Sequence, residues 1–158
     1  MTRLDPIDRE ILSLLQDDGR MSFTDVASRV GLSLSACHRR IRELESNGVI
    51  SGYRAAISPD ALGLGFEALV FVSMAHTGGD TIAAFEAAAA DVPGVTSAQR
   101  LFGDPDYLLH IRTSSLESYQ ALFDTRLSAL PGVQRLNSTI VMKQFGPSGA
   151  VPLGIATS

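Results

Sequence analysis

Apolar residues recur at helical spacing in three short stretches at the start of the chain. The first stretch follows Asp5, a favourable N-cap, and Pro6, which suits the first helical position, and it ends near Gly19. Its inner stripe comprises Ile7, Ile11, Leu14 and Leu15. This pattern predicts an amphipathic helix that buries one face.

The second and third stretches each begin at a serine. Ser22, with Asp25 three positions later, resembles a capping box, and Gly31 ends the second stretch. Shortly afterwards, Ser33 can cap a third helix that ends at Gly48. The predicted buried positions are Phe23, Val26, Ala27 and Val30, then Leu34, Cys37, Ile41 and Leu44. Two helices joined by a tight glycine turn predict a helix-turn-helix, whose second helix enters the DNA major groove.

The pattern changes after the third helix. Residues 49–57 favour extended structure and predict the short hairpin of a wing, which continues as a linker. Turn-forming residues then mark a change of domain at Pro59, Gly63 and Gly65.

From Phe66 onward, β-prone runs alternate with helical stretches. The predicted strands cover residues 69–74, 95–101, 107–111 and 137–145, and the predicted helices cover residues 81–90 and 116–130. The order strand, helix, strand, strand, helix, strand is the ferredoxin-like βαββαβ arrangement. The predicted fold class is α+β. Its parts are a winged helix-turn-helix (1–52), a linker (53–65), a ferredoxin-like domain (66–145) and a flexible tail (146–158).

Composition limits the class of protein. The chain has 158 residues, 45% of them apolar, which is typical of soluble globular proteins. No apolar run approaches the roughly 20 residues that span a bilayer, and residues 1–16 lack a signal-peptide pattern. We therefore expect a cytoplasmic protein with no membrane partner. The lone Cys37 is expected to pack in the core, and the three histidines are scattered, so we expect no metal and no cofactor.

Net charge argues weakly against contact with phosphates. The chain carries a net charge of -4, with seven basic and eight acidic residues up to Gly52 and six and nine beyond it. Non-specific DNA affinity depends on positive charge and counterion release. Any attraction to DNA phosphates must therefore come from basic side chains that are grouped locally. Arg39, Arg40 and Arg42 lie close together in the predicted third helix.

The third helix has a polar face suited to DNA. At 100° per residue, this face lies opposite the buried Cys37. Arginine pairs with guanine or holds phosphate, serine bonds phosphates or base edges, and the helix N-terminus offers free amides to a phosphate. The alternative is a solvated surface with ion pairs from Arg39 to Glu43 and from Arg42 to Glu45. The predicted DNA-binding residues are Ser33, Ser35, His38, Arg39 and Arg42.

Seven short segments carry a recognisable pattern: residues 4–8, 18–20, 30–33, 40–45, 48–53, 103–109 and 130–133. Together they resemble the Lrp/AsnC family of bacterial and archaeal regulators. The resemblance implies a winged helix-turn-helix linked to a ferredoxin-like domain, with double-stranded DNA as a partner. It also implies dimers formed through the sheets of the second domain, and often octamers of four dimers. Pro105 departs from the family, whose members frequently place another residue between the two aspartates.

The same resemblance implies that the second domain binds a small effector, an amino acid. It places the effector determinants at residues 103–107 and near the start of the last strand, across a dimer interface. An amino acid needs an acceptor for its ammonium, and Asp106 is the first choice. The alternative is an ordinary strand connection, with Thr139 and Ile140 packing in the sheet. The predicted effector residues are Leu101, Gly103, Asp104, Asp106, Thr139 and Ile140.

These features predict a sequence-specific DNA-binding transcriptional regulator that is modulated by a small effector. The alternative is a DNA-organising protein that responds to no ligand, because a ligand changes DNA occupancy only if it binds the competing states unequally. An enzyme is disfavoured, since the sequence has no nucleophile elbow, phosphate-binding glycine loop or His-Glu metal pattern.

Overall fold

The computed structural model describes residues 4–146 and 151–153. The chain divides into two compact units. Met1–Ala56 and Phe145–Ser158 form the first, and Ile57–Gln144 forms the second. The division near residue 56 falls within the predicted linker, but the C-terminal segment belongs with the first unit rather than standing apart.

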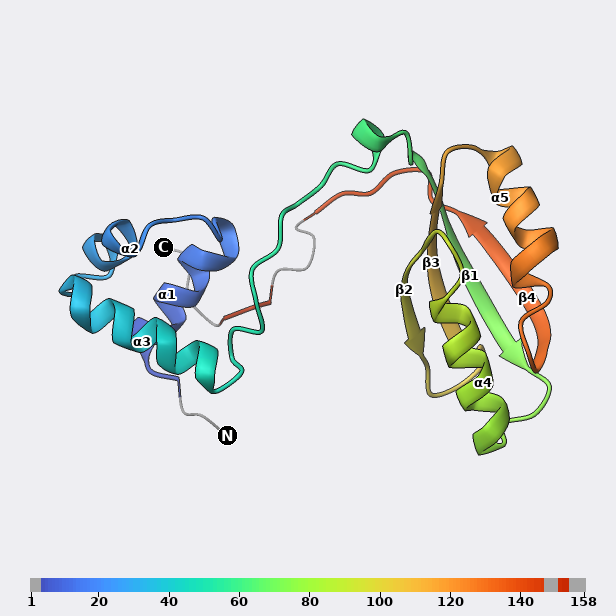
Figure 1. Ribbon diagram of the computed structural model, residues 1–158, viewed down its shortest axis with the longest axis horizontal. Helices are drawn as coiled ribbons and strands as arrows, with labels where there is room; N and C mark the ends of the chain where they lie inside the picture. The colour runs from blue at the N-terminus through green and yellow to red at the C-terminus, as the bar shows by residue number, and fades with distance from the viewer. Residues whose placement is uncertain (1–3, 147–150, 154–158) are drawn as a thin grey trace. The chain divides into compact units, whose positions relative to one another are not determined.

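The described residues of the first unit form three helices: α1 (Pro6–Asp17), α2 (Phe23–Arg29) and α3 (Leu34–Ser46) (Figure 1). Each begins after its predicted N-cap. Asp5 accepts the amide of Asp8 at 2.8 Å, and Asp8 accepts the amide of Asp5 at 3.1 Å. Ser22 and Ser33 each accept the amide three residues further on. These bonds satisfy N–H groups that have no partner within the helix, so the helix starts are set locally.

The core of the first unit is apolar and is shared by the three helices. Burial raises the pKa of the Cys37 thiol, which disfavours the reactive thiolate and is in keeping with a packing role. The buried side chains are Ile11, Leu15, Val26, Ala27, Cys37, Ile41 and Leu44.

The segment after α3 forms no strand over residues 49–57, so the hairpin predicted there is wrong. The amides of Val49 and Ile50 both bond to the carbonyl of Leu44, at 2.9 and 3.1 Å. The two side chains pack against the helical core. Val49 and Ile50 are thus half-buried against the helices, whereas Tyr53 and Ile57 further along the segment are exposed.

The C-terminal segment contacts the first unit. Val151 donates its amide to Gln16 Oε1 at 2.8 Å, and its carbonyl accepts from Gln16 Nε2 at 3.3 Å. Arg9 donates to the carbonyl of Leu153 at 2.7 Å. Backbone groups of Val151 and Leu153 thus find partners on α1, and the flexible tail at residues 146–158 stays a prediction. Residues 147–150 and 154–158 of that predicted tail lie outside the described residues.

The second unit is a four-stranded antiparallel sheet with two helices on one face (Figure 1). Its strands lie in the order β2-β3-β1-β4, which is the ferredoxin-like arrangement that the sequence predicts. The elements are a 3-10 turn η1 (Asp60–Leu62), β1 (Phe66–Met74), α4 (Gly79–Ala90), β2 (Val95–Arg100), β3 (Tyr107–Thr113), α5 (Leu116–Leu122), a π-helical turn η2 (Phe123–Leu127) and β4 (Val133–Ile140).

Side chains along the two central strands alternate between the covered face of the sheet and the opposite face. Every second side chain of β1 and β3 is buried and packs against Phe85 of α4 and Tyr119 of α5. The side chains between them lie half-buried on the opposite face, which we call the open face. It includes Leu69, Phe71 and Leu108.

The last strand starts earlier than predicted, at Val133 rather than Asn137, and ends at Ile140 rather than Phe145. The reason lies in the preceding turn. Gly132 has a φ of 72°, and a Cβ there would collide with Thr81 Cγ2, so the tight turn requires glycine. The chain therefore enters the sheet directly after this residue, and Val133 already pairs with Met74 of β1.

Candidate functional site

The predicted DNA-binding side chains gather on α3. Ser35, His38, Arg39 and Arg42 line a shallow groove, to which Glu43 and Ser46 also contribute; we call it the α3 groove. Ser33 lies at the N-terminal end of the same helix. Its Oγ accepts the amide of Ala36 at 3.3 Å, so its side chain caps the helix. The first amides of the helix remain without intrahelical partners.

Arg40 does not line the α3 groove but ties α3 to α1. Its Nη1 atom lies 2.7 Å from Asp5 Oδ2 and 2.7 Å from Asp8 Oδ1. The hydrogen bonds to Asp5 and Asp8 raise the pKa of Arg40. The pKa of Asp5 is lowered, mainly by the backbone amide of Asp8 and further by Arg40, against the effect of burial. Arg40 therefore supports the fold, and two of the three clustered arginines remain for DNA.

Those two arginines differ in their partners. Arg39 forms an exposed ion pair with Glu43 at 2.8 Å. Such pairs contribute about 0–1 kcal/mol, so Arg39 can exchange Glu43 for a phosphate at little cost. Arg42 forms no ion pair with any residue that the structure describes. The predicted pair from Arg42 to Glu45 is not formed, and Glu45 accepts the Tyr53 hydroxyl at 3.1 Å.

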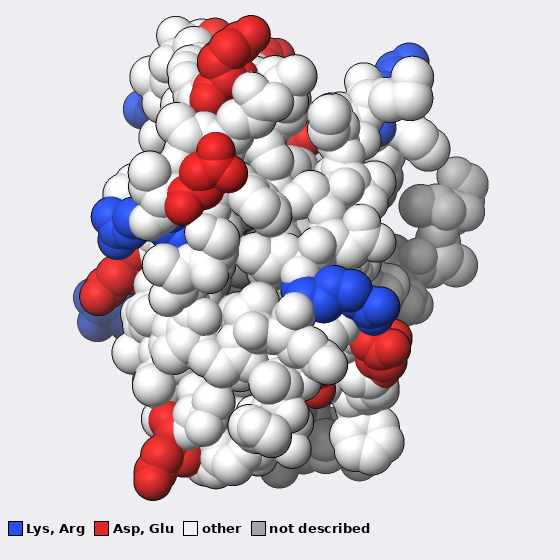
Figure 2. Space-filling model, turned by 90° about the vertical axis from the view of Figure 1, so that its right-hand side faces the viewer, with Lys and Arg blue, Asp and Glu red and all other residues white. Residues whose placement is uncertain are grey.

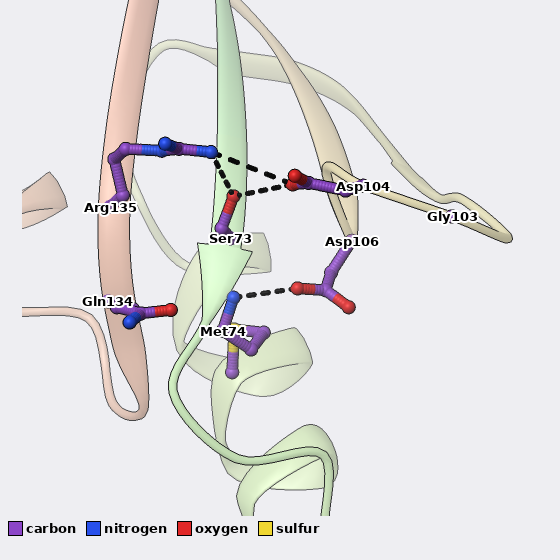
Figure 3. Close-up of a pocket in the computed structure, with 7 residues that line it drawn as sticks. All are labelled: Ser73, Met74, Gly103, Asp104, Asp106, Gln134 and Arg135. Carbon is purple, nitrogen blue, oxygen red and sulfur yellow. Dashed lines mark hydrogen bonds and ion pairs between the residues drawn. The ribbon is translucent and has the colours of Figure 1, made fainter.

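The second unit has a different surface. Figure 2 shows the side of the molecule on which α5 and β4 lie. Acidic and basic side chains are scattered there among uncharged ones. A concave site of this unit lies where β1, β3 and β4 meet. Its cavity measures about 480 Å³ and is lined by Ser73, Met74, Gly103, Asp104, Asp106, Gln134 and Arg135 (Figure 3). We call it the strand-end pocket.

Asp106 is fixed in this pocket by both its backbone and its side chain. Its amide donates to Val72 at 2.9 Å, and its carbonyl accepts from Leu101 at 2.7 Å. Its Oδ2 atom accepts the amide of Met74 at 2.7 Å (Figure 3). The pairing of β1 with β3 ends at Val72 and Tyr107, so the Asp106 carboxylate continues it by one bond. The other carboxylate oxygen remains for a ligand.

Asp104 and Arg135 bring opposite charges to the same pocket. The Ser73 hydroxyl donates to Asp104 at 3.1 Å, and Arg135 Nη2 lies 3.7 Å from Asp104 Oδ1 (Figure 3). Both charged side chains are well exposed, at 67% for Arg135 and 78% for Asp104. Their ion pair is therefore weak, and each group can turn to a ligand.

A β-bulge brings the start of β4 into the pocket. The pairing of β1 with β4 shifts between Ser73 and Met74, since Ser73 lies opposite Arg135 while Met74 lies opposite Val133. Gln134 is the extra residue of the bulge and lines the pocket. Bulges redirect side chains in this way beside binding sites.

Three of the six predicted effector residues, Gly103, Asp104 and Asp106, line the strand-end pocket. Leu101 lies before the turn and does not line it. Thr139 and Ile140 end β4 rather than start it, so their predicted place in the strand is wrong, and they do not line the pocket either. Sequence reasoning missed Ser73, Met74, Gln134 and Arg135. The correct start of β4, signalled by the Pro131 and Gly132 turn, would have suggested Arg135.

Neither site suggests a metal centre. Among residues 4–146 and 151–153, no three His, Cys, Asp or Glu side chains are grouped to hold an ion. Within the same residues, no helix is both long enough and apolar enough to cross a membrane.

Comparisons with known proteins agree with both halves of this description. A model of winged helix-turn-helix DNA-binding domains matches residues 4–51, and a model of the Lrp/AsnC ligand binding domain matches residues 67–151. The chain belongs to the Lrp/AsnC family. Its members are DNA-binding transcriptional regulators with a ligand-binding domain, and the present chain is one of them.

Full-length relatives of this Lrp/AsnC regulator are known. The Bkd operon transcriptional regulator of Pseudomonas aeruginosa is 39% identical and covers 97% of this chain and 100% of its own. A leucine-responsive regulatory protein of Rhizobium meliloti is 38% identical over 89% of this chain and 90% of its own. A transcriptional regulator of Neisseria meningitidis, solved in complex with L-Met, superimposes with a TM-score of 0.90 at 33% identity. That likeness covers 96% of this chain and 97% of the solved one. These relatives are transcriptional regulators, not enzymes.

Proposed function

We propose that this regulator senses a free α-amino acid in the strand-end pocket, needs no other cofactor, and acts on double-stranded DNA in the cytoplasm. The observation that carries the proposal is the meeting of opposite charges at one site. The carboxylates of Asp104 and Asp106 suit an ammonium group, and the guanidinium of Arg135 suits a carboxylate. A zwitterionic α-amino acid presents those two groups together.

Two further features support an amino acid as the effector. A cavity of about 480 Å³ leaves room for an amino-acid side chain beyond the charged groups. The related regulator from Neisseria meningitidis was solved with L-Met bound. A ligand with this effect must bind one state of the regulator more tightly than another, since equal affinities shift no equilibrium.

A calorimetric screen of the full-length protein against the common amino acids tests this proposal. We expect at least one amino acid to bind and to change the affinity for DNA. Arg135→Gln should weaken that binding by about tenfold or more, because it removes a charge-assisted bond to the carboxylate. Arg100→Gln is the matched control, since Arg100 lies on β2 and does not line the pocket.

The ligand-independent alternative makes the opposite prediction. A protein that only organises DNA would bind DNA with the same affinity in the presence of every amino acid tested. A response that survives unchanged in Arg135→Gln would show that the effector binds elsewhere.

We propose that the open face of the sheet pairs two copies of the chain. It carries the half-buried apolar side chains of Leu69, Phe71 and Leu108, which a second copy can cover. Phe71→Glu would place a charge in that contact, and we expect it to convert the dimer to a monomer at micromolar concentration. Sedimentation velocity of the full-length protein measures the change. An unaltered mass in this variant would exclude the open face as the dimer contact.

A further inference from the structure

An apolar patch lies at the N-terminal end of α3, beside the α3 groove. Leu34, the first residue of α3, is 52% exposed, although the helical pattern predicts it as buried. Phe23, the first residue of α2, meets His38 edge to face, with the ring centroids 5.2 Å apart. Phe23, Leu34, Ser35 and His38 line a shallow hollow, which we call the Leu34 patch.

The Leu34 patch is continuous with the α3 groove, because Ser35 and His38 line both. A recognition helix places its N-terminal residues against base edges. Leu34 therefore lies at the end of α3 that approaches the bases, where the remaining groove residues are polar or charged. The core of the first unit does not include its side chain.

The DNA major groove offers one apolar group to such a patch. Adenine, guanine and cytosine present only donors and acceptors there, whereas thymine also presents its C5-methyl group. An exposed leucine beside an aromatic ring suits that methyl and leaves no polar group unpaired.

We propose that Leu34, supported by Phe23 and His38, reads the C5-methyl of a thymine in the DNA site of this regulator. The contact would favour thymine over cytosine at one position, and it adds an apolar specificity determinant to the polar residues of the α3 groove. The inference rests on DNA binding through α3 and goes beyond it by naming the base and the atom that are recognised.

Deoxyuridine tests the contact because it differs from thymidine only by the missing methyl. A preferred DNA site is first selected in vitro with the full-length protein, and each thymine in it is then replaced singly by deoxyuridine. At one position, we expect the replacement to weaken binding of the wild-type protein roughly fourfold, the value of one buried methyl. In Leu34→Ala, the thymine and deoxyuridine probes should bind equally at that position.

Two further variants keep the test specific. Leu34→Met retains an apolar side chain of similar size and should retain the preference for thymine. Leu62→Ala is the matched control, since it removes an exposed leucine in η1 of the other unit and should leave the preference unchanged. Thermal melting shows whether each variant is folded.

The outcomes separate this inference from DNA binding itself. Failure of the wild-type protein to select any DNA would overturn both. Selection of a site in which no deoxyuridine replacement matters would overturn the thymine contact alone. A methyl preference that persists in folded Leu34→Ala would also overturn it, because another residue would then be the reader.

Discussion

Alanine at Arg42 is expected to weaken binding to the selected DNA site by about tenfold or more, since one good arginine contact to guanine contributes about 1–3 kcal/mol. Arg42 lines the α3 groove and has no ion-pair partner among the described residues, so its guanidinium is available to DNA. Removing it breaks no contact that holds the fold. Fluorescence anisotropy at fixed salt gives the affinity, and thermal melting should be unchanged.

Arg40 provides the matched control from the same helix. Arg40→Ala removes the two contacts to Asp5 and Asp8 that join α3 to α1, so we expect lower thermal stability from this variant. If Arg40→Ala and Arg42→Ala lost the same DNA affinity and the same thermal stability, the result would contradict the assignment of Arg40 to the fold and of Arg42 to DNA. The salt dependence then assigns the Arg42 contact, because loss of a phosphate contact flattens the salt slope, whereas loss of a base contact relaxes sequence preference.

The first unit could be predicted closely because its signals are local. The caps at Asp5, Ser22 and Ser33 and the apolar stripes act within a few residues of sequence, and the helices follow them. The failures were contacts over longer separations. The hairpin after α3 depends on whether a second strand returns to pair, and Gln16 meets Val151 from the far end of the chain. The apolar pattern of a segment does not show whether another strand returns to pair with it, or which distant residue it will contact.

The second unit shows the same limit at its pocket. The turn with Asp104 and Asp106 could be found from sequence, since its residue types mark it. Arg135 was missed because it reaches the pocket through pairing with Ser73, which is far away in sequence, and only the correct start of β4 would have suggested it. Because the predicted start of β4 was four residues too late, Thr139 and Ile140 were chosen as effector residues. They lie at the other end of the strand. Strand register therefore decided which side chains were identified correctly.

Asp106 offers a test of how the strand-end pocket selects its ligand. Asp106→Asn keeps the size of the side chain and an oxygen that can accept the Met74 amide, so the start of β3 should remain intact. Asp106→Ala would leave that amide without its acceptor, at a cost of about 1–3 kcal/mol. We therefore expect Asp106→Asn to fold like the wild type and Asp106→Ala to melt at a lower temperature.

The two variants then separate charge from structure. If Asp106 receives the ligand ammonium, the wild-type protein should prefer the responding amino acid to the matching carboxylic acid that lacks the amine. Asp106→Asn should lose that preference, with about tenfold or more weaker binding of the amino acid, because the charge-assisted bond is lost. Calorimetry with the two ligands measures it, and Asp104→Asn is the control. If only Asp104→Asn lost the preference, the ligand ammonium would be assigned to Asp104 instead of Asp106. If both variants retained the preference, neither carboxylate would be needed to hold the amine. The turn would then serve only to connect two strands.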